Sequence, residues 1–188
     1  LVSAIVIIEL LTQDGIEAYT LAQKGEIAQK TLRYLKAFIA RSDDLGEILQ
    51  VYSYSIINPN NMSIYKPLSS DSRVDGLNTA VLIVDELAAQ KNRLVYDALA
   101  SGMASRDEGL TIIISTAGYG KNNPMIEEYE YVVQVLDGVI DDDAWLGLIY
   151  EYDKGDRWDD TTKLLKSCPN LGVSVQLSFY EEEIKKAR

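Results

Sequence analysis

Two continuous apolar runs constrain the fold of this chain more than any other feature of its sequence. They fall within residues 80–84 and 110–115. A strand without polar alternation is typical of one that is buried on both faces. Between the two runs, a helical pattern aligns one stripe of small and apolar residues: Leu94, Val95, Ala98, Leu99 and Gly102. Buried strands that alternate with helices predict an α/β domain, with a largely parallel sheet covered by helices on both sides.

Weaker periodicities predict the other elements. We expect helices over residues 1–11, 27–39, 125–136 and 177–188. Strands are expected over residues 16–22, 50–56, 62–68 and 146–152, and the second and third should form an antiparallel hairpin around the turn at 58–61. The expected buried face of the 125–136 helix consists of Tyr129, Val132, Val133 and Leu136.

Composition excludes several kinds of chemistry. The 188 residues contain no histidine, which rules out a Ser-His-Asp or Cys-His triad and a His-ligated metal within this chain. Cys168 is the single cysteine, so an internal disulfide and a Cys-rich zinc site are excluded, and a reducing compartment is expected.

The apolar residues 1–11 include Glu9 and are too few to span a bilayer, so a buried helix is the better interpretation.

The net charge of −11 makes bulk attraction to nucleic acid unfavourable on average. The charge is uneven, because residues 141–160 carry eight carboxylates against Lys154 and Arg157, a net −6. The other 168 residues carry only −5, which leaves room for a local basic groove elsewhere.

Two adjacent carboxylates, Asp85 and Glu86, directly follow the first apolar run. Carboxylates at the end of a buried strand are unfavourable unless a cation or a reacting group lies beside them. In nucleotide hydrolases of the P-loop type, the first such carboxylate holds Mg²⁺ and the second orients or deprotonates the attacking water. The alternative is a strand end whose two solvated acids cap the next helix.

Two hydroxyl residues, Ser115 and Thr116, end the second run, which begins 24 residues after Glu86. Neighbouring parallel strands joined by one helix end at the same edge of a sheet, where ligands bind. Each hydroxyl taken alone is explained by helix capping or turn formation. Together with the two carboxylates, they predict a nucleotide-hydrolysing site.

No segment matches the phosphate-binding pattern G-x-x-x-x-G-K-[ST]. Residues 115–122 come nearest, but they follow the Asp-Glu strand instead of preceding it, and only Lys121 is kept as a minor candidate for a phosphate contact. We expect the phosphate-binding loop just upstream of Leu1, with the first helix following it.

Arg73 lies in a short loop before the Asp-Glu strand and could neutralise charge on a nucleotide across a subunit interface. The alternative, a solvated surface arginine, is the commoner case.

Three segments, in this order and spacing, resemble the ATPase domain of the tailed-bacteriophage terminase large subunit: residues 69–78, 81–86 and 111–118. Residues 168–175 are similar to that family's Asn-Pro-x-Leu-Gly stretch, with Cys168 where the family has Asn. The resemblance covers nearly the whole chain. It implies a P-loop NTPase fold of the additional-strand, catalytic-glutamate type, here with the P-loop truncated.

The resemblance also implies roles for the residues singled out above. Asp85 would be the Walker B residue that holds Mg²⁺, and Glu86 the catalytic glutamate that acts on ATP. Ser115 and Thr116 would lie in the coupling motif beside the nucleotide. Arg73 falls in the loop where some members place an arginine finger that acts in trans.

The family's biology gives the expected setting. Its members hydrolyse ATP to package double-stranded viral DNA into a procapsid, working as a homo-oligomeric ring with the portal protein and the small terminase subunit, and involve no membrane. The expected location is therefore the cytoplasm of a bacterial host, at the procapsid portal. Residues 1–188 would form an ATPase domain fragment, with the P-loop upstream, the nuclease domain downstream, and little activity of its own.

Two alternatives stay open at the level of the sequence. One is a DExx-type helicase or translocase core, which a longer sequence would reveal by an Arg-rich second lobe. The other is a catalytically silent assembly module that contacts the portal or the small terminase. The charge of −11 and the absent P-loop favour the second alternative for this segment.

Overall fold

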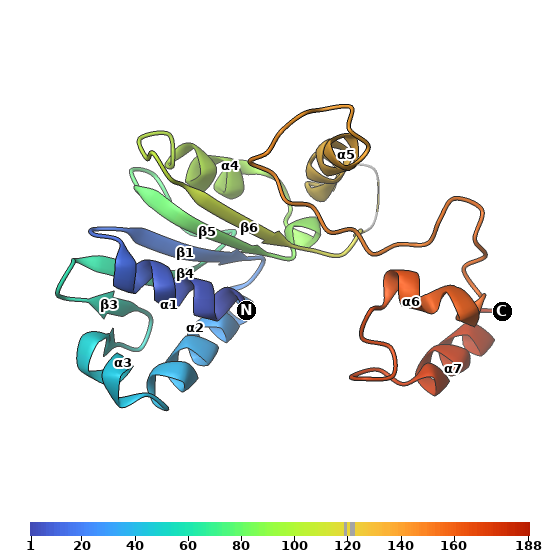
Figure 1. Ribbon diagram of the computed structural model, residues 1–188, viewed down its shortest axis with the longest axis horizontal. Helices are drawn as coiled ribbons and strands as arrows, with labels where there is room; N and C mark the ends of the chain where they lie inside the picture. The colour runs from blue at the N-terminus through green and yellow to red at the C-terminus, as the bar shows by residue number, and fades with distance from the viewer. Residues whose placement is uncertain (119, 121–122) are drawn as a thin grey trace. The chain divides into compact units, whose positions relative to one another are not determined.

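The computed structural model describes residues 1–118, 120 and 123–188 (Figure 1). These residues form two compact units, Leu1–Tyr131 and Val132–Arg188. The first unit is built around one six-stranded sheet. The second contains short helices joined by long loops.

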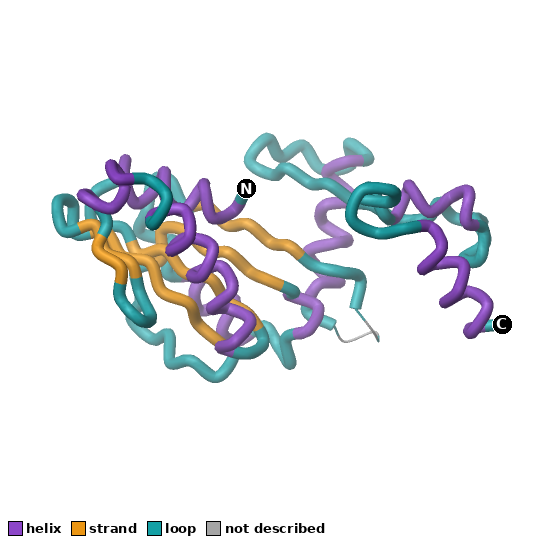
Figure 2. The backbone as a smooth tube through the Cα atoms, turned by 90° about the horizontal axis from the view of Figure 1, so that it is seen from below, coloured by secondary structure: helices purple, strands orange, loops and turns teal. Residues whose placement is uncertain are grey.

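The strands of the first unit are β1 (Glu17–Ala22), β2 (Gln50–Val51), β3 (Ile56–Asn58), β4 (Ser63–Ser69), β5 (Thr79–Asp85) and β6 (Leu110–Ile114). Their order in the sheet is β2-β3-β4-β1-β5-β6. The four strands β4, β1, β5 and β6 are parallel neighbours, whereas β2, β3 and β4 pair antiparallel. Figure 2 shows the strands of this sheet in orange, with helices beside them. The expectation of an α/β fold with a largely parallel sheet is confirmed.

Helices cover both faces of this sheet. One face packs against α1 (Val2–Thr12), α2 (Gly25–Ile39) and α3 (Asp43–Ile48), and its core includes Leu10, Leu35 and Tyr65. The other face packs against the short helix η1 (Leu87–Ala89) and against α4 (Leu94–Ser101), through Leu87 and Leu99. The sheet is therefore the middle layer of three.

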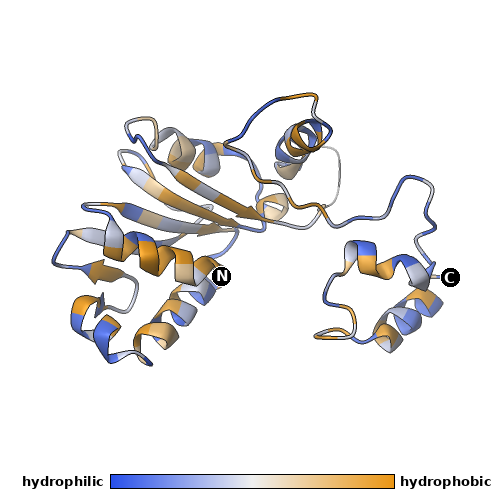
Figure 3. Ribbon diagram, in the orientation of Figure 1, coloured by the Kyte–Doolittle hydropathy of each residue, from blue (hydrophilic) through white to orange (hydrophobic). Residues whose placement is uncertain are grey.

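The apolar run of β5 is explained by this layering, because successive side chains of a strand point to opposite faces. Ile83 lies in the core under α1 and α2, whereas Leu82 and Val84 lie in the core under η1 and α4. The first six residues of β5 are all buried. Figure 3 shows the apolar colour running through the central strands and α1.

The second apolar run behaves differently. β6 is an edge strand of the described sheet and is only partly buried, so the expectation of a strand covered on both faces is wrong here. Ile114 is 49% exposed. Among the described residues no strand pairs with the outer edge of β6, which leaves its apolar side chains without neighbours on that side.

Several expected boundaries also need correction. The single strand expected over residues 50–56 is two strands, because the backbone turns at Tyr52, whose N–H donates to the Ser55 carbonyl. The antiparallel hairpin around residues 58–61 is confirmed, between β3 and β4. On α4, Tyr96 and Leu99 are buried, but Leu94 is 72% exposed.

The second unit contains the 3₁₀ turn η2 (Thr161–Lys163) and the helices α6 (Leu164–Ser167) and α7 (Leu177–Ala187). The strand expected over residues 146–152 is absent from the described structure, since no described backbone pairs with it. Helix α5 (Met125–Leu136) spans the boundary between the units in sequence. Its fully buried residue is Glu128, and Leu136, expected to be buried, is 55% exposed.

Candidate functional site

The carboxyl ends of the four parallel strands lie along one edge of the sheet. In the strand register, Ala22 at the end of β1 is opposite both Ser69 of β4 and Asp85 of β5, and Asp85 is opposite Ile114 of β6. Loops that leave these four residues therefore meet at the same edge, which is where open α/β sheets bind ligands. Asp85, Glu86, Ser115 and Thr116, four of the site residues predicted from sequence, lie at or directly after strand ends at this edge.

Asp85 is the last residue of β5 and is half buried. Burial and the neighbouring charge of Glu86 raise the pKa of its carboxyl group, and the positive charge of Lys30 on α2 acts in the opposite direction. Ionisation of Asp85 is thus less favourable than that of a solvated aspartate, and a bound cation would favour it.

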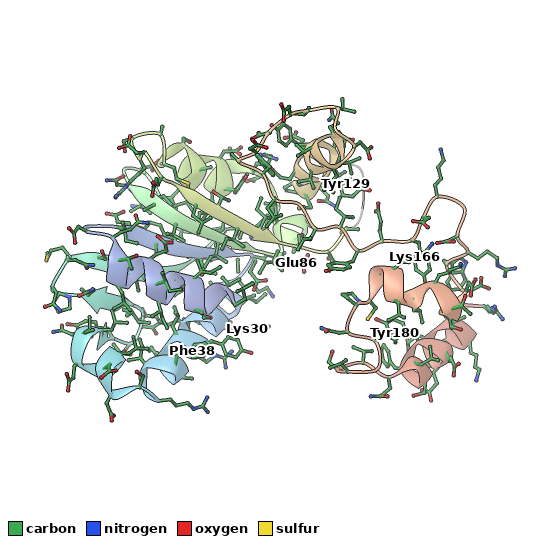
Figure 4. The ribbon with its side chains drawn as sticks, in the orientation of Figure 1. Lys30, Phe38, Glu86, Tyr129, Lys166 and Tyr180 are labelled. Atoms are coloured by element: carbon green, nitrogen blue, oxygen red, sulfur yellow. The ribbon has the colours of Figure 1, made fainter. Side chains whose placement is uncertain are left out.

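Glu86 has a left-handed backbone, with φ 61° and ψ 62°. This conformation is uncommon for a residue with a side chain and costs about 1–3 kcal/mol, so the surroundings must hold it in place. Its N–H donates to the Ile114 carbonyl at 2.7 Å, which continues the β5–β6 ladder by one further bond. The unusual φ directs the chain out of the sheet and into η1, with Glu86 at the strand ends (Figure 4).

The carboxylate of Glu86 accepts three hydrogen bonds on one oxygen. Oε1 receives the Thr116 N–H and the Thr116 hydroxyl, each at 2.7 Å, and the Ser115 hydroxyl at 3.0 Å. Partial burial opposes ionisation of Glu86, but these hydrogen bonds outweigh it and lower the pKa of the carboxyl group. Glu86 is therefore an anion with one oxygen fixed, and no described residue donates to its second oxygen, Oε2.

The loop after β6 is packed closely onto η1. The Ser115 hydroxyl accepts the Ala88 N–H at 3.0 Å, so this hydroxyl joins the two loops. At Gly118, with φ +68°, a Cβ would lie 2.7 Å from Cβ of Ala88 and 2.5 Å from Nδ2 of Asn123. A glycine is therefore required at this close approach.

The sequence prediction that Asp85, Glu86, Ser115 and Thr116 share one edge of the sheet is confirmed by these contacts. Arg73 is exposed, and its side chain makes no hydrogen bond or ion pair with a described residue. Arg73 directly follows a turn at the end of β4, in which the Ser69 N–H donates to Ser72 Oγ. The loop that contains Arg73 therefore leaves the sheet at the carboxyl edge. Lys121 lies outside the described residues.

Sequence reasoning missed Asn123, which is 8% exposed. Its side chain donates to the Ala117 carbonyl and accepts the Met125 N–H, and so connects the Thr116 loop to the start of α5. An Asn two residues before a helical run is a recognised capping signal that could have identified it. Lys30 was also missed, and no local pattern marks it, because its proximity to Asp85 depends on the packing of α2.

The described residues contain no cluster of three or more metal-binding side chains. A lone carboxylate still fits Mg²⁺, which in nucleotide sites is held by one or two carboxylates together with phosphate oxygens and water. Asp85, a carboxylate at the end of β5 whose ionisation a bound cation would favour, is the residue that fits.

Comparison with known families identifies the chain. The family model described as "Terminase large subunit, ATPase domain" matches residues 1–134. The chain belongs to this family. The family resemblance predicted from sequence is thereby confirmed.

One protein is similar to this chain in sequence, and several solved structures are similar to it in fold. Protein YmfN of Escherichia coli (strain K12) is 33% identical over 114 residues, which are 61% of this chain and 25% of YmfN. The crystal structure of the HK97 bacteriophage large terminase has a TM-score of 0.82 at 18% identity, covering 99% of this chain and 40% of that one. The large terminase ATPase domain of Thermus phage P74-26 has a TM-score of 0.53 at 20% identity, over 64% of this chain and 55% of that one.

These matches show how much of a terminase the chain represents. It spans a quarter of YmfN and two fifths of the HK97 large terminase. The structural matches, at low identity, demonstrate the fold. Within the residues described, no helix has the length and apolarity needed to cross a membrane.

Proposed function

We propose that this chain is part of an ATP-hydrolysing motor that drives double-stranded viral DNA into a procapsid. The observation that carries the proposal is the fixed Glu86 carboxylate, held by Thr116 and Ser115 at the carboxyl edge of a parallel sheet. An ionised carboxylate with one oxygen held, and the other without a donor from the described residues, is suited to accept a proton from a bound water.

In this proposal, Glu86 orients the attacking water and takes up its proton through Oε2. Asp85 holds Mg²⁺, which when bound neutralises charge on the phosphates. Ser115 and Thr116 keep the Glu86 carboxylate aimed and contact the nucleotide. Arg73, exposed and without a protein partner in the described part of the chain, acts on the nucleotide of a neighbouring subunit.

The phosphate-binding loop is proposed to precede Leu1. A P-loop joins a strand to a helix, and the phosphates lie at the N-terminus of that helix. The carbonyls of Leu10 and Gln13, at the far end of α1, accept hydrogen bonds from Asn61 and Ser63 at the amino end of β4. Helix α1 therefore begins toward the carboxyl edge, where Glu86 lies.

The strand that leads into this loop is proposed to pair with β6. The sheet has two described edges, and the β2 edge is a two-residue strand of an antiparallel hairpin. The β6 edge is parallel to its neighbour and keeps apolar side chains partly exposed. An incoming apolar strand would bury them and bring its loop to the Glu86 edge.

The wider setting is part of the same proposal. Residues 1–188 would form an ATPase domain fragment of a protein whose nuclease domain lies downstream. The assembled motor would be a homo-oligomeric ring that works with the portal protein and the small terminase subunit, in the cytoplasm of a bacterial host.

The test is ATP turnover by the full-length protein and its Glu86→Gln variant at matched concentration. Gln preserves the shape and accepts the same hydrogen bonds but cannot take a proton, so turnover should fall by about 10²–10⁴-fold while Mg-ATP still binds. Equal turnover in the two proteins would remove Glu86 from the mechanism. Nucleotide binding without turnover in either protein would favour a silent assembly module.

A further inference from the structure

Helix α2 is basic in an otherwise acidic chain. Residues 24–41 carry five cationic side chains against Glu26, a net +4 within a chain of −11. The cations are Lys24, Lys30, Arg33, Lys36 and Arg41. This is the local positive region that the overall charge leaves room for.

The cations lie away from the sheet. α2 buries Ala28, Leu32, Leu35 and Ile39 against the sheet and α1. On a helix of 3.6 residues per turn, the opposite side presents Lys30, Arg33, Tyr34 and, just beyond the last turn, Arg41. All four are exposed, with Tyr34 at 64%, and Phe38 beside them is 47% exposed. We call these five residues the α2 face; Figure 4 labels Lys30 and Phe38 on it.

A second group of aromatic side chains is fixed beside this helix. The Lys36 ammonium donates to the Ser53 carbonyl at 3.0 Å, which ties the turn between β2 and β3 to α2. The tyrosines on either side of Ser53 are exposed, Tyr52 at 49% and Tyr54 at 68%. The turn tied to the basic helix thus carries two exposed tyrosines, of which Tyr52 donates its hydroxyl to Gln50.

Within the described structure the cations of the α2 face form no ion pair, although the charge of Lys30 acts on the Asp85 carboxyl group. No described carboxylate lies within ion-pair distance of Lys30, Arg33 or Arg41, in contrast to the second unit, where Arg157, Arg188 and Lys166 are all paired. The positive charge ends at α3, which follows Arg41 in the sequence and carries three exposed carboxylates: Asp43, Asp44 and Glu47. An unpaired row of cations raises the local positive potential and suits a polyanion.

We propose that the α2 face binds the phosphodiester backbone of duplex DNA. This inference rests on the proposed motor function and assigns the surface through which it would hold DNA. Arg33, Lys30 and Arg41 neutralise phosphates, and Tyr34 donates its hydroxyl to the backbone. Phosphate contacts of this kind position a duplex without reading its sequence, as a translocating protein requires.

The test is equilibrium binding of a labelled duplex to the full-length protein without nucleotide, over a range of salt concentrations. The Arg33→Gln/Arg41→Gln double variant should bind at least about tenfold more weakly at moderate salt, equally for two unrelated sequences. The slope of log affinity against log salt should become shallower by about two, since each lost phosphate contact removes about 0.9.

The control is Lys66→Gln/Lys91→Gln, which removes the same charge from the opposite side of the sheet. Lys66 is adjacent on β4 to Tyr65, which faces α2, and Lys91 follows η1, so both exposed lysines lie away from α2. An equal loss in the control would reduce the effect to net charge and overturn the proposal. So would unchanged binding by the arginine variant, or a loss seen with single-stranded DNA alone.

The DNA-binding proposal and the ATPase proposal are tested by independent measurements. Binding is measured without ATP, so the Glu86→Gln turnover result does not bear on it. ATP turnover by the Arg33→Gln/Arg41→Gln variant, measured without DNA, should equal that of the unmodified protein, because neither arginine belongs to the Glu86 site.

Discussion

Thr116 donates both its backbone N–H and its hydroxyl to the same oxygen of Glu86, each at 2.7 Å, across 30 residues of sequence. This pair of bonds joins the loop after β5 to the loop after β6. It fixes both the ionisation and the direction of the Glu86 carboxylate, and it does so where the backbone of Glu86 is itself strained. The strain is tolerated because hydrogen bonds on both the main chain and the side chain compensate it.

Replacing Thr116 with Val should lower kcat for ATP in the full-length protein by about tenfold, with little change in KM. Val keeps the backbone N–H and the side-chain shape but loses the hydroxyl donor, so Glu86 is held less firmly. Thr111→Val, on the exposed side of β6, is the matched control and should leave kcat unchanged. A normal kcat for Thr116→Val would show that the hydroxyl has no positioning role.

Replacing Arg73 with Ala should reduce turnover in the assembled oligomer and leave the dilute monomer unaffected. The reason is that the Arg73 side chain is exposed and has no partner among the described residues of its own chain. Turnover measured across a concentration series separates the two states. An equal loss in the monomer would contradict a role in trans and place Arg73 in its own subunit's site.

Replacing Gly118 with Ala should destabilise the first unit by about 1–3 kcal/mol and also lower turnover. The new Cβ would meet Ala88 and Asn123, and the Thr116 loop would have to move away from Glu86. Gly15, also in the first unit, is a close control, because its φ is +61° and nothing lies within 4 Å of its Cβ position. Chemical denaturation of both variants should show the larger loss for Gly118→Ala; similar losses would mean that backbone strain alone is responsible.

Replacing Arg93 with Ala should destabilise the protein more than replacing Glu128 with Gln. Arg93 pairs with the buried Glu128 at 2.7 Å, and the Tyr96 hydroxyl also donates to that carboxylate. Removing Arg93 leaves a buried anion with one donor, whereas Gln is neutral and still accepts both bonds. Because Arg93 is partly exposed, we expect about 1–3 kcal/mol for the first change and less for the second. The opposite ranking in thermal or denaturant unfolding would contradict this account.

The local pattern of apolar residues predicted most of the helices and strands of the first unit. The uninterrupted apolar residues of β5 and the buried positions of α2 recur with periods that only one secondary structure satisfies. It failed at β6, where a strand of similar composition lies at an edge, because composition does not report how many neighbours a strand has. It failed again at residues 146–152, since a strand needs a partner backbone that sequence alone does not supply.

The sequence by itself determined the layered α/β architecture, the position of Asp85 and Glu86 at a strand end, and the grouping of Ser115 and Thr116 with them. These follow from local periodicity and from the rule that parallel strands end at one edge. The tertiary structure alone decided which oxygen of Glu86 is held, that Asn123 supports the loop, and that Arg33 and Arg41 face outward without an ion-pair partner among the described residues. Such features depend on contacts between residues far apart in the chain, whose distances are set only when the layers pack.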